Sequence, residues 1–216
     1  MKLYATVYQE AKAEYITQKS RFIAHISPVD SCDEAKAFIS SIKSEYKDAT
    51  HNVPVMVVGD KQEIQWSSED GEPQGTAGAP ILRMIVERGL TNLAIVVTRY
   101  FGGIKLGTGG LVRAYSTSAR LAIDKALLSE VREAIVLTYE ISYSHLAQIE
   151  NISKTGVFNI TKIEYTDKIT LEISGDINRK QEIIDTVTEV TAGKCKLLKE
   201  ESRKNKFVID SAPMLC

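Results

Sequence analysis

The sequence predicts an α+β protein with two domains. The chain has 216 residues, of which 44% are hydrophobic and 25% charged, values typical of globular chains, and its length allows one large domain or two small ones. The hydrophobic pattern changes near residues 132–135, and strand and helix signals then follow in the order β-α-β-β-α-β. We therefore expect domains at 1–133 and 134–206, followed by a tail at 207–216.

The first part of the chain predicts a strand followed by a helix. Residues 15–29 contain a β-branched and aromatic run that ends at Pro28, as at the exit of a strand. Ser31 and Glu34 have the spacing of a capping box, which predicts that a helix begins there. We expect this helix to end near Asp48. Its apolar stripe consists of Phe38, Ile39, Ile42 and Tyr46.

The rest of the first domain predicts two further helices and a hydrophobic sheet. The apolar run 53–58 has strand length, and 63–67 is its expected hairpin partner. A helix is predicted at 80–88, with Pro80 in its first turn. Residues 93–98 are the most hydrophobic strand candidate and are expected to form the central strand. The face of small residues in 111–126 predicts a closely packed helix.

The second domain is predicted to be ferredoxin-like. Its signals alternate between strand and helix in the order of a split βαβ arrangement. The hairpin is expected to turn at Thr166 and Asp167. The expected elements are strand 135–143, helix 144–154, strands 157–165 and 168–174, helix 177–190 and strand 194–199.

Charge and cysteine content restrict the function classes. The formal net charge is −1, so a polyanionic partner would have to be bound by a local patch. No apolar run reaches the roughly 20 residues that a membrane helix needs, and the first residues have no signal-peptide pattern, so we expect a cytoplasmic protein without a membrane partner. The three cysteines match neither a disulfide framework nor a zinc pattern.

The segment Thr98–Arg113 is the main candidate for binding. It has five glycines between positions 102 and 110, at an expected strand-to-helix junction where backbone amides can approach an anion. The surrounding stretch 88–123 contains no Asp or Glu. The candidate nucleic-acid or anion site comprises Arg99, Tyr100, Phe101, Gly102, Gly103, Lys105, Gly107, Gly109, Gly110, Arg113 and Arg120.

Other interpretations of this segment remain open. The glycines fit neither a Walker A loop nor a dinucleotide fingerprint, because Thr108 and Val112 stand where those motifs need Lys and Gly. The glycines can instead serve a tight turn and helix packing. Tyr100 and Phe101 can stack on bases or be buried in the core.

A second candidate site is the acidic turn containing Glu69, Asp70 and Glu72. Three carboxylates in four residues could bind Mg²⁺ or supply a general base, and the alternative is an acidic surface turn. The histidines lack zinc-site spacing, so we expect no other metal. No motif in the sequence indicates a catalytic residue, and no resident cofactor other than Mg²⁺ is considered.

Four sequence motifs of this chain resemble those of the IMPACT/YigZ family in its bacterial two-domain form. They are EDGEPQGTAGAP at Glu69–Pro80 and VVTRYFGGIKLGTGGLVRAYS at Val96–Ser116, preceded by SRFIAH at Ser20–His25 and ATHN at Ala49–Asn52. The resemblance implies a βαβ first domain of the type found in a ribosomal protein and in domain IV of elongation factor G. It also implies a second domain resembling the C-terminal domain of that factor.

The resemblance and the basic glycine segment give three hypotheses. Eukaryotic relatives regulate translation in a pathway that bacteria lack, so that function is not transferred intact. The similarity to elongation-factor domains and the basic glycine segment favour, as the leading expectation, a non-enzymatic protein that binds RNA or the ribosome. The first alternative is an enzyme or binder of a phosphorylated small molecule with Mg²⁺. The second is a regulator that binds a protein through the acidic turn and the glycine segment. The oligomeric state is left open.

Overall fold

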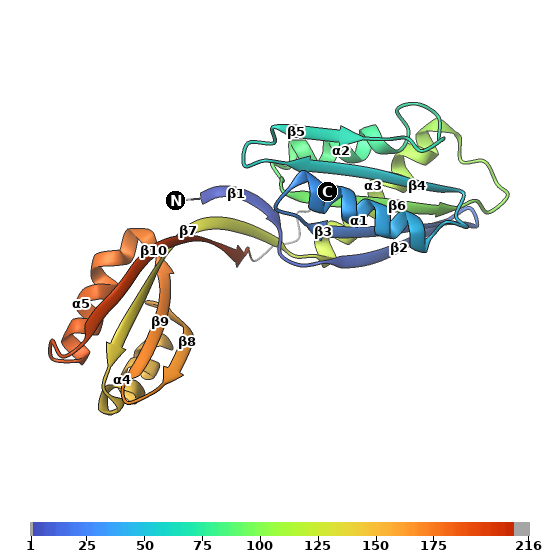
Figure 1. The fold of residues 1–216 in the computed structure, drawn as a ribbon. Helices are drawn as coiled ribbons and strands as arrows, with labels where there is room; N and C mark the ends of the chain where they lie inside the picture. Colours follow the sequence, from blue (N-terminus) through green and yellow to red (C-terminus); the bar gives the residue numbers. More distant parts are fainter. Residues whose placement is uncertain (1, 210–216) are drawn as a thin grey trace. The chain divides into compact units, whose positions relative to one another are not determined.

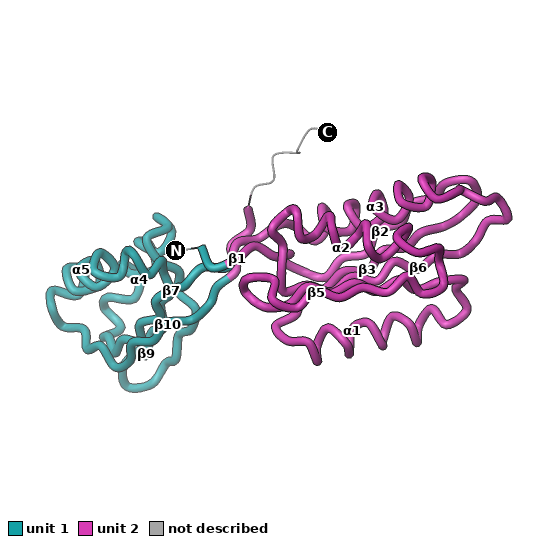
Figure 2. The backbone as a smooth tube through the Cα atoms, turned by 90° about the horizontal axis from the view of Figure 1, so that it is seen from above, with its two compact units in different colours: residues 1–3, 131–205 teal, residues 4–130, 206–216 magenta. Residues whose placement is uncertain are grey.

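The computed structural model describes residues 2–209, which form two compact units (Figure 2). The larger unit consists mainly of residues 4–130 and the smaller one of residues 131–205. The sequence places the division at 133. Of the expected tail, residues 207 and 208 belong to the last strand, and residues 210–216 lie outside the described part of the chain.

The larger unit contains a five-stranded antiparallel sheet in the order β2-β3-β6-β4-β5. The predicted central strand is confirmed, since β6 lies in the middle. The hairpin of β4 and β5 is confirmed as well. The strands are β2 (Ala11–Thr17), β3 (Ser20–Pro28), β4 (His51–Val58), β5 (Ile64–Ser67) and β6 (Leu93–Tyr100).

Helices cover both faces of this sheet, as Figure 2 shows. Helix α1 (Cys32–Glu45) packs on one face against Ala94 and Val96 of β6. Helices α2 (Gly78–Glu87) and α3 (Gly107–Lys125) pack on the other face, where β6 contributes Leu93, Ile95 and Val97. Burial on both faces explains why β6 is an almost unbroken apolar run.

The connection β3-α1-β4 is a split βαβ unit. Both strands are antiparallel to β6, which lies between them, and they are therefore parallel to each other. At the start of α1, Oγ of Ser31 accepts a hydrogen bond from the amide of Glu34 at 3.2 Å, as the capping box predicts. The carboxylate of Glu34 accepts from the amide of Asp30 at 2.8 Å. The helix ends at Glu45, three residues before the expected position.

The smaller unit has the predicted ferredoxin-like topology, in which β7 pairs with β9 and β10 and β9 pairs with β8 (Figure 1). The first strand of the chain, β1, also pairs with β7. Its helices are α4 and α5, and a short 3-10 turn precedes α5. The last strand is longer than the predicted 194–199. The elements are β7 (Leu128–Ile141), α4 (Tyr143–Ser153), β8 (Asn159–Tyr165), β9 (Ile169–Asp176), α5 (Lys180–Val190) and β10 (Lys196–Val208). The α+β, two-domain fold class is thus confirmed.

Two strands were missed by the sequence analysis, β1 (Lys2–Val7) and β2. Strand β2 is an edge strand whose residues alternate between half-buried and exposed. The turn between β2 and β3 uses Gln18 and Lys19 in left-handed conformations, with φ of 46° and 62°. Since such hairpin turns are normally signalled by Asn or Gly, this one has no sequence signal.

Among residues 2–209, no helix has both the length and the hydropathy that a membrane span requires.

Candidate functional site

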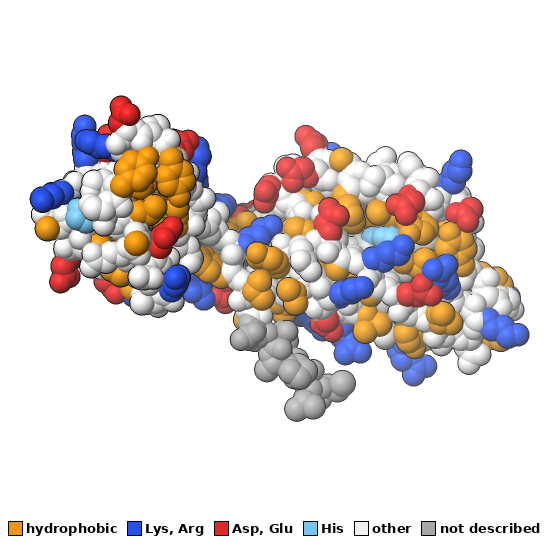
Figure 3. All heavy atoms as spheres, turned by 90° about the horizontal axis from the view of Figure 1, so that it is seen from below, with side chains coloured by type: hydrophobic (Ala, Val, Ile, Leu, Met, Phe, Trp, Pro, Cys, Tyr) orange, Lys and Arg blue, Asp and Glu red, His pale blue; other side chains and the backbone are white. Residues whose placement is uncertain are grey.

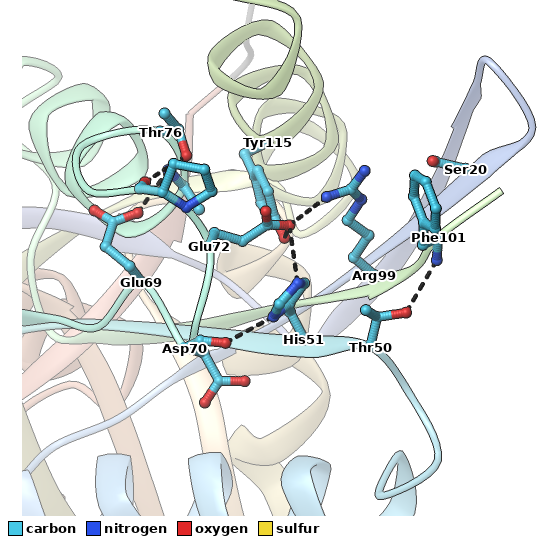
Figure 4. Close-up of polar contacts among 12 residues, drawn as sticks. Ser20, Thr50, His51, Glu69, Asp70, Glu72, Thr76, Arg99, Phe101 and Tyr115 are labelled. Carbon is cyan, nitrogen blue, oxygen red and sulfur yellow. Dashed lines mark hydrogen bonds and ion pairs between the residues drawn. The ribbon is translucent and has the colours of Figure 1, made fainter. Parts of the chain in front are cut away.

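A cleft of about 470 Å³ opens at the start of α3 in the larger unit. Four segments meet there: the start of β4, the end of β6, the acidic turn and the first turn of α3. His51 and Arg99 are brought side by side because they are paired in the register of β4 and β6. The cleft thus joins the two candidate sites of the sequence analysis (Figure 4).

A buried ion pair forms one wall of the cleft. Nη1 of Arg99 lies 2.6 Å from Oε1 of Glu72, and the two side chains are only 7% and 3% exposed. The hydroxyl of Tyr115 donates to the same oxygen at 2.7 Å. Burial, with a further contribution from the Glu72 hydrogen bond, raises the pKa of Tyr115 well above its ordinary value, so the phenol stays protonated and keeps donating.

His51 is held between the acidic turn and the ion pair. Its Nδ1 lies 2.7 Å from the carbonyl oxygen of Asp70, so Nδ1 carries a proton and donates it. Its Nε2 lies 3.7 Å from Oε1 of Glu72 (Figure 4). The sequence analysis did not assign His51 to a site. The only signal for it was its place in the ATHN motif, because its partners are 19 and 21 residues away along the chain.

The other two acidic residues are committed to separate structural roles. The carboxylate of Glu69 accepts from the amides of Ala77, Gly78 and Ala79, at 2.8, 3.1 and 3.1 Å, and so caps α2. That of Asp70 accepts from Nζ of Lys43 and from the amide of Asn52, both at 2.6 Å.

The three carboxylates therefore do not converge on one point, and their arrangement does not fit the Mg²⁺ site considered from the sequence. Within residues 2–209, no set of three His, Cys, Asp or Glu side chains is placed to hold a metal ion.

The acidic turn owes its shape to two left-handed residues. Asp70 has φ of 47° and Gly71 has φ of 89°. Glycine adopts such a conformation without steric cost. The turn sends the Asp70 side chain toward Lys43 of α1 and the Glu72 side chain toward Arg99.

The aromatic residues of the glycine segment point in different directions. The ring of Phe101 is 44% exposed and lines the cleft, where the Arg99 guanidinium carbon lies 5.4 Å from its centroid. The hydroxyl of Tyr100 donates to Asp48 at 3.0 Å. Partial burial and this bond raise the pKa of Tyr100. Phe101 is thus accessible to a ligand in the cleft. Tyr100 instead connects the end of β6 to Asp48, in the segment that follows α1.

Glycines of this segment have different structural roles. A Cβ atom at Gly102 would lie 2.0 Å from the carbonyl carbon of Lys19, so only glycine allows the segment to pack against the β2–β3 turn. The amide of Gly102 also donates to Oγ of Ser20 at 3.1 Å. By contrast, a Cβ atom at Gly109 would meet no heavy atom of residues 2–209 within 4 Å, apart from its chain neighbours and the backbone of its own helix. Close packing therefore explains why position 102 is a glycine, whereas it does not explain the glycine at position 109.

The first turn of α3 has no side-chain cap. Its N-cap is Leu106, and the first turn contains no acidic residue. Within residues 2–209, the N-cap side chain and the first turn thus supply no acceptor for these amides, which carry the positive end of the helix dipole. Gly107 and Thr108 line the cleft at this end, beside Lys105.

A second hollow of about 500 Å³ adjoins the cleft and shares Lys105 and Leu106 with it. Gly110 and Arg113 of α3 line it, with Tyr15 of β2. Arg113 and Arg120 are exposed and stand seven residues apart on α3, which places them on one face of the helix. Gly103 is also exposed, with φ of 86°.

Exposed basic residues therefore continue from the cleft along α3. On the face drawn in Figure 3, basic and acidic side chains are interspersed over the larger unit. Because the net charge of the chain is −1, the protein as a whole does not attract an anion. An anionic partner would therefore bind at the basic residues beside the cleft and along α3.

Known proteins share both parts of this chain. Residues 18–123 match the model of the Impact N-terminal domain, and residues 140–194 match that of a domain of unknown function (DUF1949). The IMPACT family member YvyE of Bacillus subtilis is 38% identical over 191 residues, which cover 88% of each chain. The IMPACT family member YigZ of Escherichia coli is 33% identical over 196 residues, covering 89% of this chain and 93% of the relative.

A solved crystal structure of a hypothetical protein has the same fold, with a TM-score of 0.58 and 30% identity, over 93% of this chain and 98% of its own. The Impact N-terminal match contains every residue that lines the cleft, from Thr50 to Leu111. The sequence resemblance, both domain matches and these relatives agree, and the chain belongs to the IMPACT family.

Proposed function

We propose that the protein is a non-enzymatic RNA-binding module that acts in translation, on free RNA or on the ribosome, and that the cleft at the start of α3 binds the RNA backbone. The observation that carries this proposal is the uncapped first turn of α3, which opens into a cleft beside Lys105. Free helix amides and a lysine together form a site suited to a phosphate group.

The acidic residue in the cleft does not oppose an anion. Glu72 is paired with Arg99 at 2.6 Å and accepts a further hydrogen bond from Tyr115. Its charge is therefore compensated within the protein. The cations available to a ligand are the exposed ones, Lys105, Arg113 and Arg120, whereas Arg99 serves to hold Glu72.

The extent of the basic surface favours a nucleic acid over a single small phosphate. Two adjoining hollows share Lys105, and the exposed arginines continue for about 10 Å along α3 at 1.5 Å per residue. The exposed ring of Phe101 offers a surface on which a base can stack. The translation context rests on the resemblance to eukaryotic family members.

The proposal is tested by fluorescence anisotropy with a labelled 12-nucleotide single-stranded RNA and a labelled duplex, each at two salt concentrations. We expect salt-sensitive binding that the Lys105→Ala/Arg113→Ala variant weakens, with a salt slope smaller by about 1 for each lost phosphate contact. Lys61→Ala is the matched control, because Lys61 is exposed in the same unit outside the cleft. Equal affinity and slope in wild type and double variant would contradict the site.

Two other outcomes would redirect the assignment. Calorimetric binding of a mononucleotide with Mg²⁺, without RNA binding, would favour the alternative of a phosphorylated small molecule. A partner captured through the cleft that survives nuclease treatment and high salt would favour the protein-binding alternative, since nucleic-acid binding falls steeply with salt.

A further inference from the structure

A second surface lies on the opposite face of the same sheet, where α1 leaves β5 uncovered. A groove of about 890 Å³ runs there between α1 and the β4–β5 hairpin, a volume within the range of sites that hold a ligand. None of the residues assigned to the candidate sites lines this groove.

The floor of the groove is apolar. It consists of Ile39 of α1, Pro54 and Met56 of β4, and Trp66 of β5. Trp66 is paired with Met56 across the hairpin, so the two side chains lie on the same face of the sheet. The indole is 44% exposed and Ile64, two residues earlier on the same face, is 45% exposed. Exposed large side chains beside an apolar groove indicate a surface that a partner covers.

The rim of the groove is basic. Lys36, Lys43 and Lys47 line it, and none of the described residues that line it is acidic. Lys36 is 68% exposed, and its contact with Asp33 at 3.8 Å joins two exposed groups, so it contributes little. Lys43 is half-buried and hydrogen-bonded to Asp70. The exposed charges of Lys36 and Lys47 are therefore available to an acidic partner.

From this arrangement we infer that the groove binds an acidic protein segment, whose apolar side chains cover Trp66 and Met56 and whose carboxylates pair with Lys36 and Lys47. An apolar floor with a charged rim is the pattern of a groove that binds an amphipathic peptide. Methionine adapts to partners of different shape, and tryptophan is often the residue that contributes most to binding.

A single-stranded nucleic acid fits this groove less well. Sites for such strands offer successive aromatic rings on which bases stack. Here the floor is aliphatic except for Trp66. The inference concerns a face of the sheet that the proposed RNA site does not use, so it stands or fails independently of that proposal.

The test starts from a displayed library of random dodecapeptides, selected on the full-length protein. Clones are retained if they bind wild type and fail to bind the Lys36→Glu/Lys47→Glu variant. We expect the retained peptides to be rich in Asp or Glu together with Leu, Phe or Trp. No retained clones, or retained clones without acidic residues, would overturn the inference.

A retained peptide is then titrated while the fluorescence of Trp66 is recorded. Trp66 is the only tryptophan of the chain, so the signal comes from the groove itself. We expect a saturable change in emission and at least a tenfold weaker affinity in Lys36→Glu/Lys47→Glu, with no loss in the control Lys61→Glu. An oligouridylate that gives a tighter, saturable change than the peptide would overturn the assignment to a protein partner.

Discussion

Arg99 and Glu72 are 27 residues apart in the sequence and form a buried ion pair, with Nη1 of Arg99 2.6 Å from Oε1 of Glu72. The Arg99 guanidinium carbon lies over the rings of both Phe22 and Phe101, at 5.4 Å from each centroid. The pair fixes the acidic turn to the end of β6, and so it determines the shape of the cleft whether or not either residue contacts a ligand.

Glu72→Gln is expected to destabilise the larger unit by about 3 kcal/mol, because it leaves the buried Arg99 charge uncompensated. The loss should be smaller when Arg99→Met is added, since the double variant removes both charges. Urea unfolding followed by the fluorescence of Trp66 measures this unit selectively, because Trp66 is the only tryptophan. The exposed control Arg120→Ala should change the free energy of unfolding by about 0.5 kcal/mol or less. Strictly additive effects of the two changes would contradict the coupling.

Glu69→Ala is expected to cost about 1 to 2 kcal/mol, because it removes the cap of α2. Mg²⁺ should leave the Tm of the wild type unchanged, since the three carboxylates of the acidic turn have separate partners. Thermal unfolding of the wild type and of Glu69→Ala, each with Mg²⁺ and with chelator in excess over Mg²⁺, measures both effects. A rise in Tm with Mg²⁺ that disappears in Glu69→Ala would restore the metal hypothesis.

Gly109→Ala should weaken RNA binding without weakening the fold. A Cβ atom at this position meets no neighbour within 4 Å, and alanine favours a helix over glycine by up to about 1 kcal/mol. If a phosphate approaches the first turn of α3, the added methyl group obstructs it. Anisotropy binding and urea unfolding of the same variant separate the two effects. Unchanged RNA affinity in a fully folded variant would speak against a phosphate at this turn.

The stability of the larger unit should fall as the pH decreases from about 6.5 to about 4. Burial, more than the nearby charge of Lys12, lowers the pKa of His25 from 6.5 to about 4. Within this pH window the unfolded state binds more protons than the folded state, so protonation favours unfolding. Urea unfolding at pH 7 and pH 5, followed by Trp66, measures the decline.

His25→Phe removes the titrating group and keeps a ring against Tyr46, which lies 4.8 Å from the His25 ring centroid. This variant should lose less stability between pH 7 and pH 5 than the wild type does. An identical decline would assign the pH dependence to other groups.

Local signals allowed much of the fold to be predicted. The Ser31–Glu34 spacing located α1 because capping depends on residues three apart, and the run at 93–98 identified the central strand because it is buried on both faces. Strand β2 was missed because its edge position leaves it half-exposed and its turn lacks Gly or Asn.

The sequence predicted where the candidate site lies better than it predicted what its individual residues do. The glycine segment and the acidic turn are local motifs, and the structure brings them together at one cleft. The pairing of Arg99 with Glu72 depends on tertiary packing across 27 residues, which no local pattern encodes. For the same reason no sequence pattern indicated the groove at Trp66, since the lysines that line the groove come from α1 and from the segment after it.

The difference between Gly102 and Gly109 has a consequence for deep mutational scanning of the glycine segment. Since the Lys19 backbone occupies the space beside Gly102, every replacement there should deplete folded protein from a library. At Gly109 small replacements should persist in a selection for abundance and disappear in a selection for activity. Comparing the two selections at each position of the glycine segment would distinguish the residues that the fold requires from those that contact a partner.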